Sequence, residues 1–338
     1  AAGGCCGGGR RPGAQVREGS PGSTRASDGD AEEEAPCRQL RWGACQVPHP
    51  QKAHYGGEDS FFLSADGSAA GVADGVSEWG WRFGLNPRDF ASQLMDASGA
   101  AVERLAAEGA PGGAELAARA LAEGHAEVRA FGAATAIVAC LEAGGRVLGV
   151  ANLGDSGLRQ LRRVPGSPAV RVVGRTREQQ HGLCQPFQLS RIPGGEELTG
   201  LLAEGKRALV EAVRRSPDVK PDLPGDAELY SFELQEGDLL LLASDGVFDN
   251  LYDSELCSIV EEALSESESP GPRPTAGDEL PDPMELSKRI AEAARRRSQD
   301  RASATPFSDR VVQAGFRHLG GNPDDITVLA AWAPGASG

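Results

Sequence analysis

Short apolar runs separated by turn residues recur along most of this chain, and this pattern predicts β-strands. Tight turns such as Ala143-Gly144-Gly145 join neighbouring runs, which favours antiparallel sheet. The expected strands are Leu40–Val47, Ser60–Leu63, Ala69–Ala73, Ala134–Leu141, Val147–Leu153, Gly157–Arg163, Val170–Val173, Leu229–Glu233, Asp238–Ala243 and Asp325–Trp332.

Apolar residues spaced three or four positions apart predict helices between the strands. Pro87 opens the first helix, since proline suits the first turn, and Gly109 ends it. Further helices are expected at Ala114–Arg129, around Leu198–Arg214, at Ser254–Leu264 and at Met284–Ser298. The segment Val76–Asn86, with Trp79, Trp81 and Phe83, is expected to be a loop.

This order of elements predicts an α+β fold in which helices cover antiparallel sheet. We expect one domain over residues 40–333, with surface insertions near 191–228 and 265–283. The second insertion is rich in Ser, Glu and Pro, and we expect it to be disordered. Residues 1–39 are expected to be a disordered tail or the remnant of an organelle transit sequence, because arginines outnumber acids in residues 1–27.

Composition narrows the function classes. The net charge of −15 over 338 residues argues against nonspecific nucleic-acid binding. No apolar run is long enough to span a membrane. The seven cysteines include no Cys-x-x-Cys pair, so a reducing compartment is expected. We expect a monomer.

Acidic residues stand at the ends of several predicted strands. Asp74 follows Gly71-Val72-Ala73, and Asp245 follows the apolar run 239–244. Glu58 and Asp59 precede one apolar run, and Asp324 precedes another. Each could be a simple turn acid, as in an Asp-Gly turn. Their recurrence predicts instead a site where carboxylates gather around hard divalent cations.

Five motifs in this order resemble the type 2C metal-dependent serine/threonine protein phosphatases. They are Gly-Gly-Glu58-Asp59, Gly-Val-Ala-Asp74-Gly75, Gly154-Asp155-Ser156, Ser-Asp245-Gly246-Val-Phe-Asp249-Asn and Gly-Asn-Pro-Asp324-Asp325-Ile-Thr327. The segments Val47-Pro48-His49-Pro50 and Cys257-Ser258-Ile259-Val260 are similar to the organelle-targeted, T-cell-activation-type branch, which includes plant photosystem II core phosphatases.

The resemblance implies a four-layer α-β-β-α sandwich and hydrolysis of phosphoserine and phosphothreonine in phosphoprotein substrates. It implies two Mn²⁺ or Mg²⁺ ions with a bridging water as the nucleophile. Asp74 would contact both ions, Asp245 and Asp324 one, and Glu58 and the Gly75 carbonyl the other. Acids that match Asp59, Asp155 and Asp249 would orient these ligands or hold a third ion. Chloroplast is the expected compartment, with mitochondrion as the alternative.

Two positions depart from the family pattern. His54 stands where many members carry a phosphate-binding arginine, and Val76 stands where many carry a histidine acid. His54 could contact phosphate, or a bound water could donate the proton. A catalytically silent phosphatase-like binding module and a small-metabolite phosphatase are therefore the alternatives, although a silent module has no need to keep Asp74, Asp245 and Asp324 together.

Overall fold

The computed structural model describes residues 39–215, 220–267 and 280–334. Contacts divide the chain into Ala1–Ala35 and Pro36–Gly338, and only the second unit contains described residues. The predicted disordered tail therefore lies outside the described residues except for Gln39. Most of the predicted insertion near 265–283, residues 268–279, also lies outside them.

One antiparallel sheet combines strands from both ends of the domain. Its strands, in spatial order, are β1 (Arg41–Val47), β13 (Ile326–Trp332), β12 (Leu239–Ala243), β6 (Gly157–Arg163) and β7 (Val170–Arg175). The first and last strands of the domain are hydrogen-bonded along their whole length, with Arg41 opposite Trp332 and Val47 opposite Ile326. This pairing closes the domain around its termini.

The second antiparallel sheet is built mainly from the N-terminal half. Its strands, in spatial order, are β11 (Glu228–Glu233), β5 (Val147–Leu153), β4 (Gly132–Leu141), β3 (Ala69–Gly75) and β2 (Ser60–Leu63). The short strand β10 (Leu189–Arg191) also pairs with β4, and β8 (Gln180–Gly182) pairs with β9 (Gln185–Pro186) beside it.

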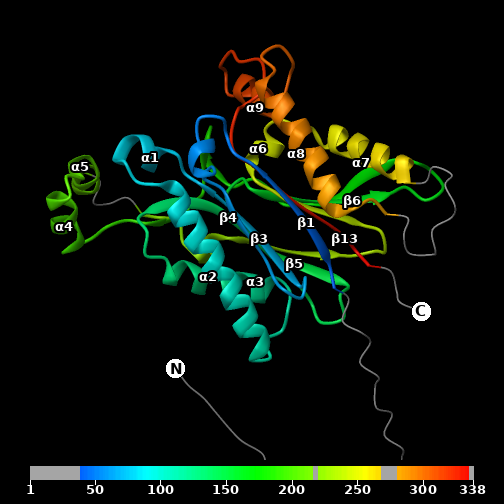
Figure 1. Cartoon of the computed structure of the whole chain (residues 1–338), viewed down its shortest axis with the longest axis horizontal. Coiled ribbons are helices and arrows are strands. Elements are labelled where there is room, and N and C mark those ends of the chain that lie inside the picture. The colour runs from blue at the N-terminus through cyan, green and yellow to red at the C-terminus, as the bar shows by residue number, and fades with distance from the viewer. Residues whose placement is uncertain (1–38, 216–219, 268–279, 335–338) are drawn as a thin grey trace, which may run out of the picture. The chain divides into compact units, whose positions relative to one another are not determined.

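A pair of helices covers the outer face of each sheet (Figure 1). Helices α2 (Pro87–Ala107) and α3 (Ala114–Glu127) pack on the second sheet. Helices α7 (Asp253–Ser267) and α8 (Pro283–Gln299) pack on the first sheet. The predicted four-layer α-β-β-α sandwich is therefore confirmed.

The strand runs are apolar without alternation because both faces of each sheet are buried. In β12, Leu239 and Leu241 face the core under α7 and α8, whereas Leu240 and Leu242 face the core between the sheets. The same division occurs in β3, where Ala73 faces α2 and α3 and Val72 faces the opposite sheet.

Three sequence predictions need correction. The segment predicted as a loop contains helix α1 (Glu78–Phe83), because Trp79 and Phe83 pack on an apolar cluster. The single helix predicted around Leu198–Arg214 is two helices, α4 (Glu197–Ala203) and α5 (Arg207–Arg215), which are separated at Gly205 with its φ of 80°. Helices α6 (Asp245–Phe248) and α9 (Pro306–Gln313) were not predicted.

Candidate active site

The strand register brings the acidic strand ends to one edge of the sandwich. In the second sheet, Asp74 lies opposite Thr135, and the end of β5 pairs one residue further along β4. In the first sheet, the end of β12 pairs with both the start of β6 and the start of β13. Asp155 lies in the turn that leads from β5 in one sheet to β6 in the other.

A pocket of about 210 Å³ opens at this edge. Five aspartates line it: Asp74, Asp155, Asp245, Asp249 and Asp324. The same wall contains Gly75, Val76, Ser77, Thr135, Gln180, Cys184, Pro186, Phe307, Arg310 and Asn322. The sequence prediction that these aspartates lie together therefore agrees with their position in the fold.

Asp74 and Asp245 both line the pocket, and each keeps some exposed area. Burial, followed by repulsion from Asp59, Asp245 and Asp324, raises the pKa of Asp74 well above its ordinary value. Burial and then repulsion from neighbouring aspartates raise the pKa of Asp245 in the same direction. Among the described residues, neither carboxylate has a salt-bridge partner. A cation is the natural partner for such a pair.

Buried carboxylate oxygens without a hydrogen bond mark the same region. Within the described residues, Oδ1 of Asp59, Asp155 and Asp245 is buried and has no hydrogen-bond partner. Burial raises the pKa of Asp59 and of Asp155 to about 7, with repulsion from Asp325 and Asp249 respectively as the next cause. Unsatisfied buried oxygens are costly, so they indicate a ligand that supplies positive charge.

Lys52 supplies positive charge at one end of this acidic region. Its Nζ lies 2.7 Å from Glu58 Oε2, 3.2 Å from Asp324 Oδ1 and 3.1 Å from Asp325 Oδ2. Although burial opposes its charge, Asp324, Glu58 and Asp325 raise the pKa of Lys52 above its ordinary value. The sequence analysis assigned Lys52 no role, because only the fold shows that these three acids surround it.

Arg310 of α9 supplies positive charge at the other end. Its guanidinium pairs with Asp249 and lies 3.4 Å from Glu178 Oε1. Sequence reasoning missed this residue because α9 was not predicted and no motif points to it. The acidic region thus has Lys52 and Arg310 at its two ends and the Asp74–Asp245 pair between them.

Two of the acids position the backbone around the pocket. Asp325 accepts hydrogen bonds from the backbone amides of His49 (2.7 Å) and Glu58 (2.9 Å), which ties the loop after β1 to the start of β13. Asp59 accepts a 2.7 Å hydrogen bond from the Thr327 hydroxyl. Asp59 is not among the residues that line the pocket, and its expected orienting role stays a prediction.

Two close approaches explain the Asp-Gly pairs. A Cβ on Gly75 would lie 2.7 Å from the Glu58 carbonyl oxygen, and a Cβ on Gly246 would lie 2.1 Å from the Asp325 carbonyl oxygen. Any larger residue would push apart the segments that carry the acids.

Other predicted site residues lie outside the pocket wall. Glu58 is buried beside the wall and accepts hydrogen bonds from Ser77 and from the Tyr55 hydroxyl (3.1 Å), besides its contact with Lys52. His54 is exposed, and its Nδ1 lies 3.1 Å from the Gln51 carbonyl oxygen.

The oxygen donors of the pocket fit the expected metal ions only in part. In the part of the chain that the structure describes, no three His, Cys, Asp or Glu side chains are arranged as a metal-ligand group. Glu58 instead forms an ion pair with Lys52, and Asp249 forms one with Arg310. The all-oxygen donors Asp74, Asp245 and Asp324, with the unpartnered Asp245 Oδ1, nevertheless fit a hard divalent cation.

Among the described residues, no helix is both long and apolar enough to cross a membrane.

Several known proteins are similar to this chain. The family model "Protein phosphatase 2C" matches residues 223–302. The chain is 32% identical to "Probable protein phosphatase 2C 55" of Arabidopsis thaliana, over 86% of this chain and 51% of that protein. It is also 32% identical to "Probable protein phosphatase 2C 1" of Oryza sativa subsp. japonica, over 86% of this chain and 75% of that protein. The chain spans about half the length of the first curated relatives it matches.

Among solved structures, the chain is similar to the photosystem II phosphatase PBCP. The two share 30% sequence identity and a TM-score of 0.65, over 87% of this chain and 98% of that chain.

Proposed function

Because this chain belongs to the protein phosphatase 2C family, we propose that it hydrolyses phosphoserine and phosphothreonine in proteins with two Mn²⁺ or Mg²⁺ ions. The observation that supports this proposal most directly is the convergence of Asp74, Asp245 and Asp324 on one pocket. Their oxygens come from three distant parts of the chain, and Asp74 and Asp245 have no cationic side chain beside them in the described residues. A catalytically silent module has no use for such a costly arrangement.

The ligand set of this proposal is the one that the family resemblance implies. Asp74 would contact both ions, with the Gly75 carbonyl and Glu58 on one and with Asp245 and Asp324 on the other. When bound, such ions supply a strong nucleophile at neutral pH and offset the charge of the phosphoryl oxygens. Glu58 has to exchange part of its contact with Lys52 to take up this role.

The chain's own residues hold the acids in place and shape the pocket. Arg88 donates hydrogen bonds to the carbonyl oxygens of Gly56 (2.7 Å) and Asp59 (3.0 Å), which fixes the loop that carries Glu58. Within the described wall there is no histidine, and Val76 occupies part of it. The proton for the leaving alkoxide therefore comes from water in this proposal, since His54 lies outside the wall.

The test measures hydrolysis of p-nitrophenyl phosphate and of a phosphothreonine peptide with and without Mn²⁺. The wild-type protein should hydrolyse both only with the metal ion, and Asp245→Asn should lose this activity. Asp300→Asn is the matched control, because Asp300 is an acid outside the pocket that caps a turn through Ala302 N (2.8 Å). Metal-independent activity, or equal activity of both variants, would contradict the proposal.

The same measurement separates the alternatives. Hydrolysis of p-nitrophenyl phosphate with no activity on any phosphopeptide would favour a small-metabolite phosphatase. Absence of both activities in a folded, Mn²⁺-treated protein would favour a silent binding module.

We also propose a chloroplast location. It is supported by the similarity to a photosystem II phosphatase and by the arginine-rich, acid-poor residues 1–27. Fluorescence microscopy of the full natural chain fused to a reporter tests it, and a mitochondrial pattern would favour the alternative.

A further inference from the structure

We infer that Arg310 is a built-in cation that closes the Asp155–Asp249 side of the pocket to a third divalent ion, so that the protein holds two ions. This inference rests on the proposed function, because it concerns the number of ions at the same site. It assigns Arg310 a role in setting metal stoichiometry.

Arg310 already forms an ion pair with Asp249. One oxygen of Asp249 pairs with the Arg310 guanidinium, and the other accepts a 2.9 Å hydrogen bond from Asn322 Nδ2. The Asp249 side chain is only 5% exposed. Both oxygens are therefore engaged, and an incoming ion has to displace a buried, charge-assisted contact to reach them.

Hydrogen bonds hold α9, the helix that carries Arg310, against the rest of the domain. Thr305 caps α9 by accepting a 3.1 Å hydrogen bond from Ser308 N, and its hydroxyl donates to the Gly320 carbonyl oxygen at 2.9 Å. Tyr252 donates a 2.8 Å hydrogen bond to Asp309. The guanidinium is thus held at the pocket wall by a fixed element rather than by an exposed loop.

Two further carboxylates, those of Asp155 and Glu178, lie near the Arg310 guanidinium. Asp155 lines the same pocket, its Oδ1 is buried without a hydrogen-bond partner, and Arg310 is close enough to stabilise its charged form. Glu178 adds a further carboxylate at 3.4 Å from the guanidinium. Without Arg310, three carboxylates would gather with no cation among the described residues. That set is the kind of oxygen site which binds Mn²⁺ or Mg²⁺.

The experiment counts bound Mn²⁺ by equilibrium dialysis and metal analysis at about 10 mM free ion, which exceeds the dissociation constants of weak oxygen sites. Wild-type protein should bind two ions, and Arg310→Gln should bind three. Arg310→Lys should stay at two, because it keeps the charge. The double variant Arg310→Gln/Asp249→Asn should return to two, because a ligand of the new site is lost.

Arg297→Gln is the matched control. Arg297 is also partly buried, at 27% exposure against 28% for Arg310, and it pairs with a carboxylate, Glu255, away from the pocket. It should stay at two ions.

Three ions in the wild-type protein would overturn the inference without any variant, as would two ions in a folded Arg310→Gln protein or three in Arg297→Gln. None of these results would contradict metal-dependent phosphatase activity. A wild-type protein that binds no Mn²⁺ would instead contradict the proposed function itself.

Discussion

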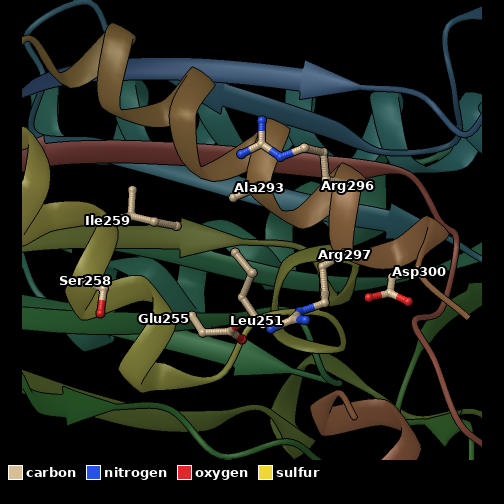
Figure 2. A pocket seen from close by; sticks show the side chains of 8 residues that line it. All are labelled: Leu251, Glu255, Ser258, Ile259, Ala293, Arg296, Arg297 and Asp300. Atoms are coloured by element: carbon tan, nitrogen blue, oxygen red, sulfur yellow. Dashed lines mark hydrogen bonds and ion pairs between the residues drawn. The ribbon is translucent and has the colours of Figure 1, made fainter. Parts of the chain in front are cut away.

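Two hollows of this protein contain acids and arginines, and they differ in charge balance as well as in size. Figure 2 shows the groove between α7 and α8, where Glu255 and Arg297 point toward each other. This groove measures about 400 Å³, against about 210 Å³ for the pocket at the sheet edge. In the groove Glu255 has an arginine partner, whereas Asp74 and Asp245 in the pocket have none among the described residues.

The comparison teaches that unbalanced charge marks the candidate active site better than volume does. A carboxylate that already pairs with an arginine in a partly exposed groove contributes little to stability and needs no ligand. A buried group of carboxylates without enough cations is unfavourable alone and becomes favourable only with a ligand that brings positive charge.

The largest expected difference is in activity. Asp74→Asn should lower the Mn²⁺-dependent kcat/KM on a phosphopeptide by at least about 100-fold, since even residues behind the metal ligands typically change activity by that much. Glu255→Gln in the groove should change it by less than about twofold. Steady-state kinetics measure both, and a similar loss in the two variants would remove the distinction between the hollows.

The second difference concerns the lysines. Lys52→Gln should lower the free energy of unfolding by about 3 kcal/mol. The substitution removes the buried cation with which three carboxylates pair. Lys288→Gln should change it by less than about 0.5 kcal/mol, because this lysine of α8 is 58% exposed and lies 4.0 Å from Glu285. Urea unfolding provides the measurement. Equal effects of the two substitutions would mean that Lys52 is not a buried counter-ion.

The third difference is a pH dependence that arises in the pocket and directly beside it. Asp59 and Asp155 have a pKa of about 7 in the folded protein against an ordinary 3.8. The folded state therefore binds more protons than the unfolded state between these values, so their effect is to lower stability as pH rises from about 4 to about 7. Above pH 7 their contribution is constant.

In EDTA, the melting temperature should therefore fall by about 5 °C or more between pH 5 and pH 8, and Asp155→Asn should flatten this slope. Saturating Mn²⁺ should reduce it as well, because ions bind the ionised carboxylates. A melting temperature that rises over this range in EDTA would contradict the assigned pKa shifts.

The smallest expected effect is at His54. Because its ring is exposed and lies outside the pocket wall, His54→Ala should change kcat and KM by less than about twofold. A tenfold rise in KM for a phosphopeptide would contradict this expectation and would support the phosphate contact that the sequence position of His54 suggests.

The sequence predicted the sandwich well because its signals are local. The unbroken apolar runs at Leu239–Leu242 and Ala69–Ala73 read directly as strands buried on both faces. Helices α1, α4 and α5 were harder to predict from the sequence, because short helices are stabilised mainly by tertiary contacts. Here those contacts are made through the apolar cluster around Leu209 and Val210.

The candidate site was predicted equally well at the strand ends. Asp74, Asp245 and Asp324 follow or precede apolar runs, and the register of the sheets brings them to one edge. Each of these acids carries its signal in the residues next to it along the chain.

The cations Lys52 and Arg310 carry no such local signal. A lysine or arginine in a polar segment reads as a solvated surface residue, and only folding decides which carboxylates surround it. The sequence by itself therefore determined the strands, the layers and the acids of this protein. The tertiary structure alone decided how those acids are neutralised, because charge compensation depends on distances between segments far apart in the chain.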